Sequence, residues 1–310
     1  MKRILVPYDF SETSQQALEK GIFLSLKYKA TLVVLHIIEK TFNDEFVGML
    51  WPPKELSSQL KQKIQSEIEK RVPKHSEKIQ TEILIQVGRA YVEILRTLEK
   101  EKIDLIVIGT HGRTGFKHFR LGSVAEKVVQ HSSVPVFIHR GEARAPKRIL
   151  IPVDFSENSK EGFRLGLKWA SDLQSEIYLL HVVGLQDLYS YKDLFLPVEP
   201  SLEEALKKEA QEKLKAWSKE IQIPFHQEVR IGNPFLEIKA AIENQNIDLV
   251  VLATHGRTGL KHFLMGSIAE QVVRHSPCSV LTIRPAAFVQ PAIKFFDNEE
   301  AFDEYMKSCN

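Results

Sequence analysis

The sequence predicts an α/β protein made of two tandem doubly wound domains, each a five-stranded parallel sheet with helices on both faces. Short apolar runs alternate with helical patterns along the chain, which is typical of parallel strands joined by crossover helices. The chain also repeats itself. Residues 103–140 return, largely identical, as residues 247–284, and residues 2–12 return as residues 147–157. Repeats in the same order and at nearly the same offset indicate a duplicated domain.

These repeats set the expected domain limits. The first domain is expected over residues 1–142 and the second over residues 146–286, with a few small and charged residues between them. Residues 287–310 have no counterpart in the first half and form a C-terminal tail. A chain of 310 residues is long enough for two domains of ordinary size.

Each half begins with an apolar strand that runs into the pattern Pro-x-Asp-x-Ser, whose serine can cap the helix that follows. Gly21 and Gly166 lie at equivalent places inside that helix. Because a mid-helix glycine costs roughly 1 kcal/mol relative to alanine, its presence in both copies predicts close packing on the sheet. The other strands are nearly all apolar, as expected for strands covered on both faces. Besides the strand that opens each long repeat, strands are expected at 4–6, 31–38, 81–87, 134–139, 149–153, 176–183, 225–231 and 279–284.

Composition gives no reason to expect nucleic acid or a membrane as partner. The net charge of +2 does not suggest the basic stripe that nucleic-acid binding needs, and no apolar run approaches the length of a membrane span. The start of the chain is too soon interrupted by Pro7 and Asp9 to be a signal peptide. The two cysteines form no disulfide framework. These features predict a cytoplasmic protein that binds neither nucleic acid nor a membrane.

A glycine-rich basic loop follows the fourth strand of each half. Glycines let backbone amides approach an anion, and the positive end of a helix dipole favours negative charge at the helix start. Each Gly-Ser pair is followed three residues later by a glutamate, which fits a capping box. The anion site is therefore expected to use Gly109, His111, Gly112, Arg113, Gly122 and Ser123 in the first half, and Gly256, Arg257, Gly266 and Ser267 in the second.

Other readings of these loops are weaker. A tight strand-to-helix turn without a ligand is the simplest alternative, but the cations and the repetition favour an anion site. No cluster of Cys, His and Asp at ligand spacing accompanies His111 or His255, so these histidines are expected to form hydrogen bonds and no metal site is predicted. Neither half has a G-x-S-x-G turn, so no catalytic residue is assigned. The three tryptophans are expected to pack in the core.

The spacing Gly-x2-Gly-x9-Gly-Ser, formed by Gly109, Gly112, Gly122 and Ser123, resembles the ATP-binding signature of the universal stress protein family. The openings Pro7-Asp9-Ser11 and Pro152-Asp154-Ser156 also resemble the first strand of that family, and the similarity covers nearly all of both halves.

This resemblance implies an adenine nucleotide α-hydrolase-like fold and ATP as ligand, with or without Mg²⁺. It places Asp9 and Asp154 near the ribose or a metal, and the backbone at His36–Ile37 and at Val182 near adenine. Pro7 and Ser11 belong to the same site. The carboxylate of Asp9 has an alternative role, which is to cap its own loop.

The second half departs from the signature at one position, where Ala253 stands in place of Gly109. If that position needs a positive φ, a β-carbon there costs on the order of 1–2 kcal/mol. A factor of ten in affinity corresponds to about 1.4 kcal/mol. Alanine is therefore expected to weaken the second site, which leaves the first site as the better one.

Three functions are consistent with these features. The favoured one is a non-enzymatic, ATP-binding regulatory protein of the stress response that acts by population shift. The second is a slow ATPase or phosphotransferase, for which Asp9 and Asp154 are the only candidate carboxylates. The third is a partner-binding protein with vestigial sites. The resemblance also implies pairing of the two halves through their last strands as an intrachain pseudo-dimer, with a homodimer and unidentified protein partners left open.

Overall fold

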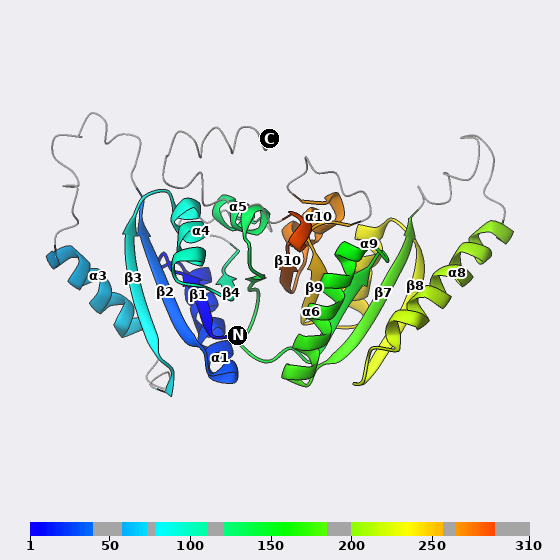
Figure 1. Ribbon diagram of the computed structural model, residues 1–310, viewed down its shortest axis with the longest axis horizontal. Coiled ribbons are helices and arrows are strands. Elements are labelled where there is room, and N and C mark those ends of the chain that lie inside the picture. Colours follow the sequence, from blue (N-terminus) through cyan, green and yellow to red (C-terminus); the bar gives the residue numbers. More distant parts are fainter. Residues whose placement is uncertain (40–57, 73–77, 111–120, 185–199, 257–264, 289–310) are drawn as a thin grey trace, which may run out of the picture. The chain divides into compact units, whose positions relative to one another are not determined.

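The computed structural model describes residues 1–39, 58–72, 78–110, 121–184, 200–256 and 265–288. The described chain divides into two compact units, residues 1–144 and residues 145–288, each with five parallel strands (Figure 1). The predicted class, α/β with two tandem doubly wound domains, is confirmed. Within the described residues, no helix combines the length and the apolar character that crossing a membrane would require.

The first unit is a five-stranded sheet in the order β3-β2-β1-β4-β5, with all neighbouring strands parallel. Helix α1 packs on β1, β2 and β4, whereas α4 and α5 pack against each other. The chain order is β1 (Arg3–Pro7), α1 (Glu12–Tyr28), β2 (Thr31–Ile38), α3 (Ser58–Arg71), β3 (Thr81–Val87), α4 (Ala90–Lys100), β4 (Leu105–Ile108), α5 (Ser123–His131) and β5 (Val136–Ile138).

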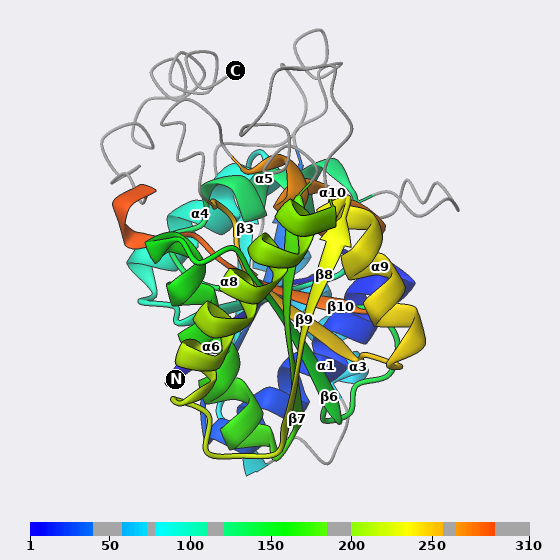
Figure 2. The same ribbon diagram turned by 90° about the vertical axis from the view of Figure 1, so that its right-hand side faces the viewer.

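The second unit repeats this arrangement with the sheet order β10-β9-β6-β7-β8. Helices α6 and α8 lie on one side of its sheet and α9 on the other (Figure 2). The elements are β6 (Arg148–Val153), α6 (Glu157–Leu173), β7 (Glu176–Gly184), α8 (Pro200–Ser218), β8 (Phe225–Gly232), α9 (Pro234–Asn244), β9 (Leu249–Ala253), α10 (Ser267–His275), β10 (Ser279–Ile283) and a 3-10 turn at Ala286–Phe288.

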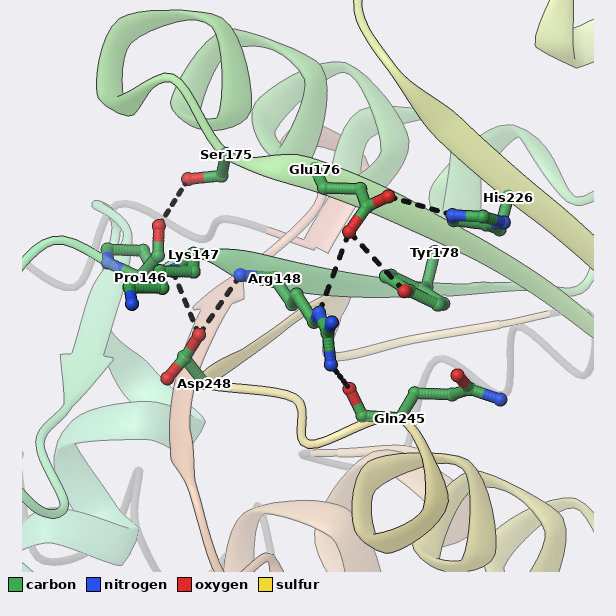
Figure 3. Close-up of polar contacts among 9 residues, drawn as sticks. All are labelled: Pro146, Lys147, Arg148, Ser175, Glu176, Tyr178, His226, Gln245 and Asp248. Carbon is green, nitrogen blue, oxygen red and sulfur yellow. Dashed lines mark hydrogen bonds and ion pairs between the residues drawn. The ribbon is translucent and has the colours of Figure 1, made fainter.

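One aspartate in each unit ties the first strand to the fourth at their amino ends. In the second unit, Oδ2 of Asp248 accepts hydrogen bonds from the backbone nitrogens of Lys147 (2.8 Å) and Arg148 (3.0 Å), as Figure 3 shows. Asp104 does the same for Lys2 and Arg3 in the first unit. These bonds align neighbouring strands, and therefore also bring their carboxyl ends together.

A second polar cluster joins the amino ends of β6, β7 and β8. Glu176 contacts Nε2 of His226 at 2.7 Å and Nε of Arg148 at 3.5 Å, and the hydroxyl of Tyr178 at 3.4 Å (Figure 3). The Tyr178 ring stacks on His226 with centroids 4.7 Å apart. This cluster lies at the end of the sheet opposite to the loops discussed below.

The predicted close packing at the two mid-helix glycines is confirmed. A β-carbon on Gly21 would overlap Cγ2 of Val6 and lie 3.3 Å from Cδ1 of Leu32. A β-carbon on Gly166 would lie 2.5 Å from Cδ1 of Ile151. Both glycines therefore bring the first helix of each unit closer to its sheet than alanine would allow.

Candidate functional site

The candidate sites lie beyond the carboxyl ends of β1 and β4 in the first unit and of β6 and β9 in the second. Between these strands the order of the sheet reverses, since β1 has β2 on one side and β4 on the other. Open parallel sheets bind ligands in the crevice at this point, because adjacent loops diverge to opposite faces.

The aspartate of each opening motif forms a tight turn with the serine two residues later. Oδ1 of Asp9 accepts hydrogen bonds from the backbone nitrogen of Ser11 (3.0 Å) and from its hydroxyl (2.6 Å). Asp154 and Ser156 show the same two distances. In both copies the aspartate therefore does cap its own loop, which was its alternative role. The capping hydrogen bonds use Oδ1.

The serine of each motif caps the following helix, as predicted. The hydroxyl oxygen of Ser11 accepts a hydrogen bond from the backbone nitrogen of Ser14, and that of Ser156 accepts one from Ser159. The helix start is thus fixed directly against the aspartate, with Pro7 ending β1 just before the turn. Carboxylate, serine and helix N-terminus form one rigid corner.

Sequence reasoning missed the residue between aspartate and serine. Phe10 has φ 67° and Phe155 has φ 63°, both in the left-handed region that a bulky residue rarely adopts. The signal was available, because Asp-Phe-Ser occurs in both openings and the aspartate closes a turn over the middle residue. A conformation costing on the order of 1 kcal/mol and kept in both copies is typical of a functional corner.

A buried histidine supports this corner from the neighbouring strand. Nδ1 of His36 lies 2.7 Å from the carbonyl oxygen of Tyr8, and Nδ1 of His181 lies 2.7 Å from that of Val153. Because a carbonyl oxygen only accepts, Nδ1 carries the proton. The rings of Phe10 and Phe155 pack against these histidines. The side chain of His36 is therefore structural, which leaves its backbone for a ligand.

The positions expected near adenine, Ile37 and Val182, belong to the second strand of each unit. Ile37 and Val182 are half-buried residues near the carboxyl ends of β2 and β7. Each is adjacent to the buried histidine that binds the first strand. The backbone at these positions is thus held in place next to the aspartate corner.

The second unit shows a glycine cradle around its aspartate. A β-carbon on Gly256 would overlap Oδ2 of Asp154, so this position accepts only glycine while the carboxylate keeps its place. A β-carbon on Gly266 would lie 3.4 Å from the carbonyl oxygen of Thr254 and 3.9 Å from the backbone nitrogen of Gly256. Asp154, Gly256 and Gly266 therefore converge, although they are far apart in the sequence.

The base of each glycine loop is closed by one backbone hydrogen bond. The nitrogen of Gly122 donates to the carbonyl oxygen of Thr110 at 2.6 Å, and that of Gly266 donates to Thr254 at 2.7 Å. Both bonds bring the start of the next helix back to the end of the fourth strand. His111, Gly112, Arg113 and Arg257 lie outside the described residues.

The predicted helix start needs a correction. Gly122 and Gly266 are the N-cap residues, without a side-chain hydrogen bond, and Ser123 and Ser267 are the first helical residues. The capping-box interpretation is wrong because the loop-closing bond places the glycine, in extended backbone, at the cap. Ser123 and Ser267 are exposed in the structure, at the first residues of α5 and α10.

The reason given for a weaker second site also needs a correction. Neither Gly109 nor Ala253 has a positive φ, so alanine is not strained there. Gly109 is instead required by packing, since a β-carbon would lie 2.6 Å from the carbonyl oxygen of Thr13 in α1.

Three of the residues that were expected to pack or to form hydrogen bonds, His255, Trp169 and Trp217, lie in the described part of the chain. Nδ1 of the buried His255 lies 3.0 Å from the hydroxyl of Thr254, which confirms a hydrogen-bonding role. Trp169 is 1% exposed, and Trp217 packs on Phe155 and Phe163. Trp51 lies outside the described residues. Within the described part of the chain, no group of three or more His, Cys, Asp or Glu side chains is placed to hold a metal ion.

Comparison with known families agrees with this geometry. The model of the universal stress protein family matches twice, over residues 1–140 and 146–284. The chain belongs to the universal stress protein family. Its duplicated halves each correspond to one family unit.

Two similar universal stress proteins each match a little under half of the chain. The universal stress protein MJ0531 of Methanocaldococcus jannaschii is 35% identical over 144 residues, which is 44% of this chain and 82% of that protein. The universal stress protein MJ0577 of the same organism is 33% identical over 152 residues, covering 44% of this chain and 93% of that protein.

The fold of the whole chain also has a known counterpart. The crystal structure of a universal stress protein from Archaeoglobus fulgidus covers 91% of this chain and 98% of its own, with a TM-score of 0.63 at 22% identity. At this identity the similarity supports the fold alone.

Proposed function

We propose that this universal stress protein binds an adenine nucleotide, with ATP as the ligand, at the carboxyl ends of its parallel strands. The observation that carries this proposal is the convergence in the second unit of the Asp154 carboxylate, which lies directly against Gly256, with Gly266 at the N-cap of α10. Glycines that admit a ligand's phosphates to the backbone, next to a helix N-terminus, are a common way to bind phosphate.

The proposed roles follow the geometry of the corner. Asp9 and Asp154 would bind the ribose hydroxyls or a bound Mg²⁺, since Oδ1 is already held by the following serine and orients the carboxylate. The exposed Ser123 and Ser267, at the first turn of α5 and α10, would contact phosphate oxygens together with the helix dipole. The backbone at Ile37 and Val182 would contact adenine.

In this proposal the protein acts as a regulatory binding protein rather than as an enzyme. Phosphoryl transfer requires a base positioned on the nucleophile and phosphates clamped by metal or cations. The candidate carboxylates are instead anchored in a turn by two hydrogen bonds each, which suits them to hold a ligand. The bound and free forms would differ in the surface shown to partners.

The proposal also keeps the wider expectations from the sequence: domain limits at 1–142 and 146–286, a tail at 287–310, a location in the cytoplasm, and partner proteins for the bound form. Pairing of the two halves and a homodimer remain predictions.

The test is to heat-denature the purified protein and identify released nucleotide by chromatography and mass spectrometry, followed by equilibrium dialysis with ATP. Binding of ATP supports the proposal. Hydrolysis at a steady rate that disappears in both Asp9→Asn and Asp154→Asn would favour the ATPase instead. No released nucleotide and no ATP binding would leave the partner-binding function with vestigial sites.

A further inference from the structure

The two units differ in where one glycine stands at the contact between the first helix and the fourth strand. In the first unit Gly109 directly follows β4, and α1 carries Ala17. In the second unit the residue equivalent to Gly109 is Ala253, and the residue equivalent to Ala17 is Gly162 on α6. Each unit therefore has one glycine and one alanine at these two positions, with their places exchanged.

In each unit the glycine is required by a close approach of backbone. A β-carbon on Gly109 would lie 2.6 Å from the carbonyl oxygen of Thr13. A β-carbon on Gly162 would lie 2.7 Å from the backbone nitrogen of Ala253 and 3.1 Å from the carbonyl carbon of Leu252. Backbone atoms inside a packed helix and strand do not move aside individually.

We infer that the second unit binds an adenine nucleotide as fully as the first, because the strand position that Ala253 occupies faces the first helix and not the ligand. The inference rests on the proposed function. The side chain at this strand position faces the first helix, as the contact of residue 109 with Thr13 shows. Gly256, which lies against the Asp154 carboxylate, and Gly266, the N-cap of α10, are both kept.

A neighbouring residue supports the same conclusion. Nδ2 of Asn158, in the first turn of α6, donates a hydrogen bond to the carbonyl oxygen of Gly256 at 3.2 Å. Its counterpart in the first unit is Thr13, whose backbone crowds Gly109. In the second unit the helix start therefore holds the backbone of Gly256 in position. Asn158 is a positioning residue for the second site.

Stoichiometry tests the inference on the full chain. Native mass spectrometry and titration calorimetry with ATP are expected to give two nucleotides per chain, with dissociation constants within about tenfold of each other. One nucleotide per chain would overturn the inference and leave the proposed function standing. No binding would overturn both, so the two failures are distinguishable.

A matched pair of variants tests the exchange itself. Ala253→Gly removes atoms only, and is expected to leave the affinity of the second site unchanged within about threefold. Gly162→Ala adds a methyl group against the backbone of β9, and is expected to lower that affinity by about tenfold or more and to lower the melting temperature of the ligand-free protein. Gly256→Val, which places a side chain on the Asp154 carboxylate, identifies which of the two binding events belongs to the second unit.

Ala253→Gly tests the inference even if Gly162→Ala does not fold. A rise of about tenfold in second-site affinity in Ala253→Gly would show that the methyl group obstructs the ligand, which overturns the inference. Asn158→Ala is expected to weaken the second site while the first site keeps its affinity. Equal weakening of both sites would contradict a positioning role for Asn158.

Discussion

The carboxylate of Asp154 lies directly against Gly256, and its Oδ2 atom occupies the place that a β-carbon at residue 256 would need. The same carboxylate is anchored through Oδ1 to Ser156. One oxygen is thus fixed to the end of the first strand, and the other lies at the glycine loop after the fourth. This relationship joins the two motifs into one site.

Gly256→Ala is expected to displace the Asp154 carboxylate, because the added methyl group overlaps Oδ2. We expect a loss of about tenfold or more in ATP affinity at the second site and a fall in unfolding free energy of about 1–3 kcal/mol, as is usual for overpacking. Urea unfolding and calorimetry measure both. Gly266→Ala is the control for stability, since its nearest contact would be an ordinary 3.4 Å. Equal destabilisation by the two substitutions would contradict this explanation.

The two cap serines provide matched substitutions. Ser11→Ala and Ser156→Ala each remove a helix cap and a hydrogen bond to the aspartate. Loss of a cap costs about 1 kcal/mol in unfolding free energy. Because the serines belong to separate motifs with no shared partner, the double variant should lose close to the sum. Unfolding followed by circular dichroism checks the sum, and a change near zero in either single variant would rule out the cap as a stabilising element.

In Gly21→Ala, two effects of known size act on the unfolding free energy in opposite directions. Helix propensity favours alanine by roughly 1 kcal/mol, whereas overpacking costs typically about 1–3 kcal/mol. At Gly21 the obstacle is the branched Cγ2 of Val6, so we expect net destabilisation. At Gly166 the obstacles are Cδ1 and Cγ1 of Ile151, at 2.5 and 2.9 Å, and the longer isoleucine side chain can turn further aside, so the loss should be smaller. Thermal unfolding of both variants gives the order, and a stabilised Gly21→Ala variant would disprove the close packing.

His139 makes stability depend on pH. Burial, together with the charge of Lys20, lowers the pKa of this histidine from 6.5 to about 4. The unfolded chain therefore binds the proton more readily than the folded one. The contribution is fully present above pH 6.5 and is lost as the pH falls toward 4, by about 2 kcal/mol at pH 5.

The check is urea unfolding of the wild type and of His139→Gln at pH 7.5, 6 and 5. Carboxylates also lose charge in acid, so the difference between the two proteins isolates the histidine. The variant should lose less stability between the highest and lowest pH than the wild type. Parallel curves would show that His139 does not contribute to the acid sensitivity.

Much of the fold was predictable because its determinants are local or repeated. Alternating apolar runs predicted the parallel sheets, and the duplicated openings predicted the aspartate, the capping serine and the close-packed Gly21 and Gly166. The left-handed Phe10 and Phe155 were missed because a bulky residue rarely adopts positive φ, and only the turn closed by the aspartate imposes it. The helix caps at Gly122 and Gly266 were missed because a distant carbonyl, on Thr110 or Thr254, positions them.

The sequence by itself therefore determined the duplication, the α/β class and the residues that gather at the strand ends. Only the tertiary structure decided what each glycine faces. Gly256 meets a carboxylate, Gly109 meets a helix carbonyl, and Gly162 meets the backbone beside Ala253. A glycine in the sequence indicates that a side chain would not fit at that position. The atom that excludes the side chain belongs to another segment, because packing brings together residues that are far apart in the sequence.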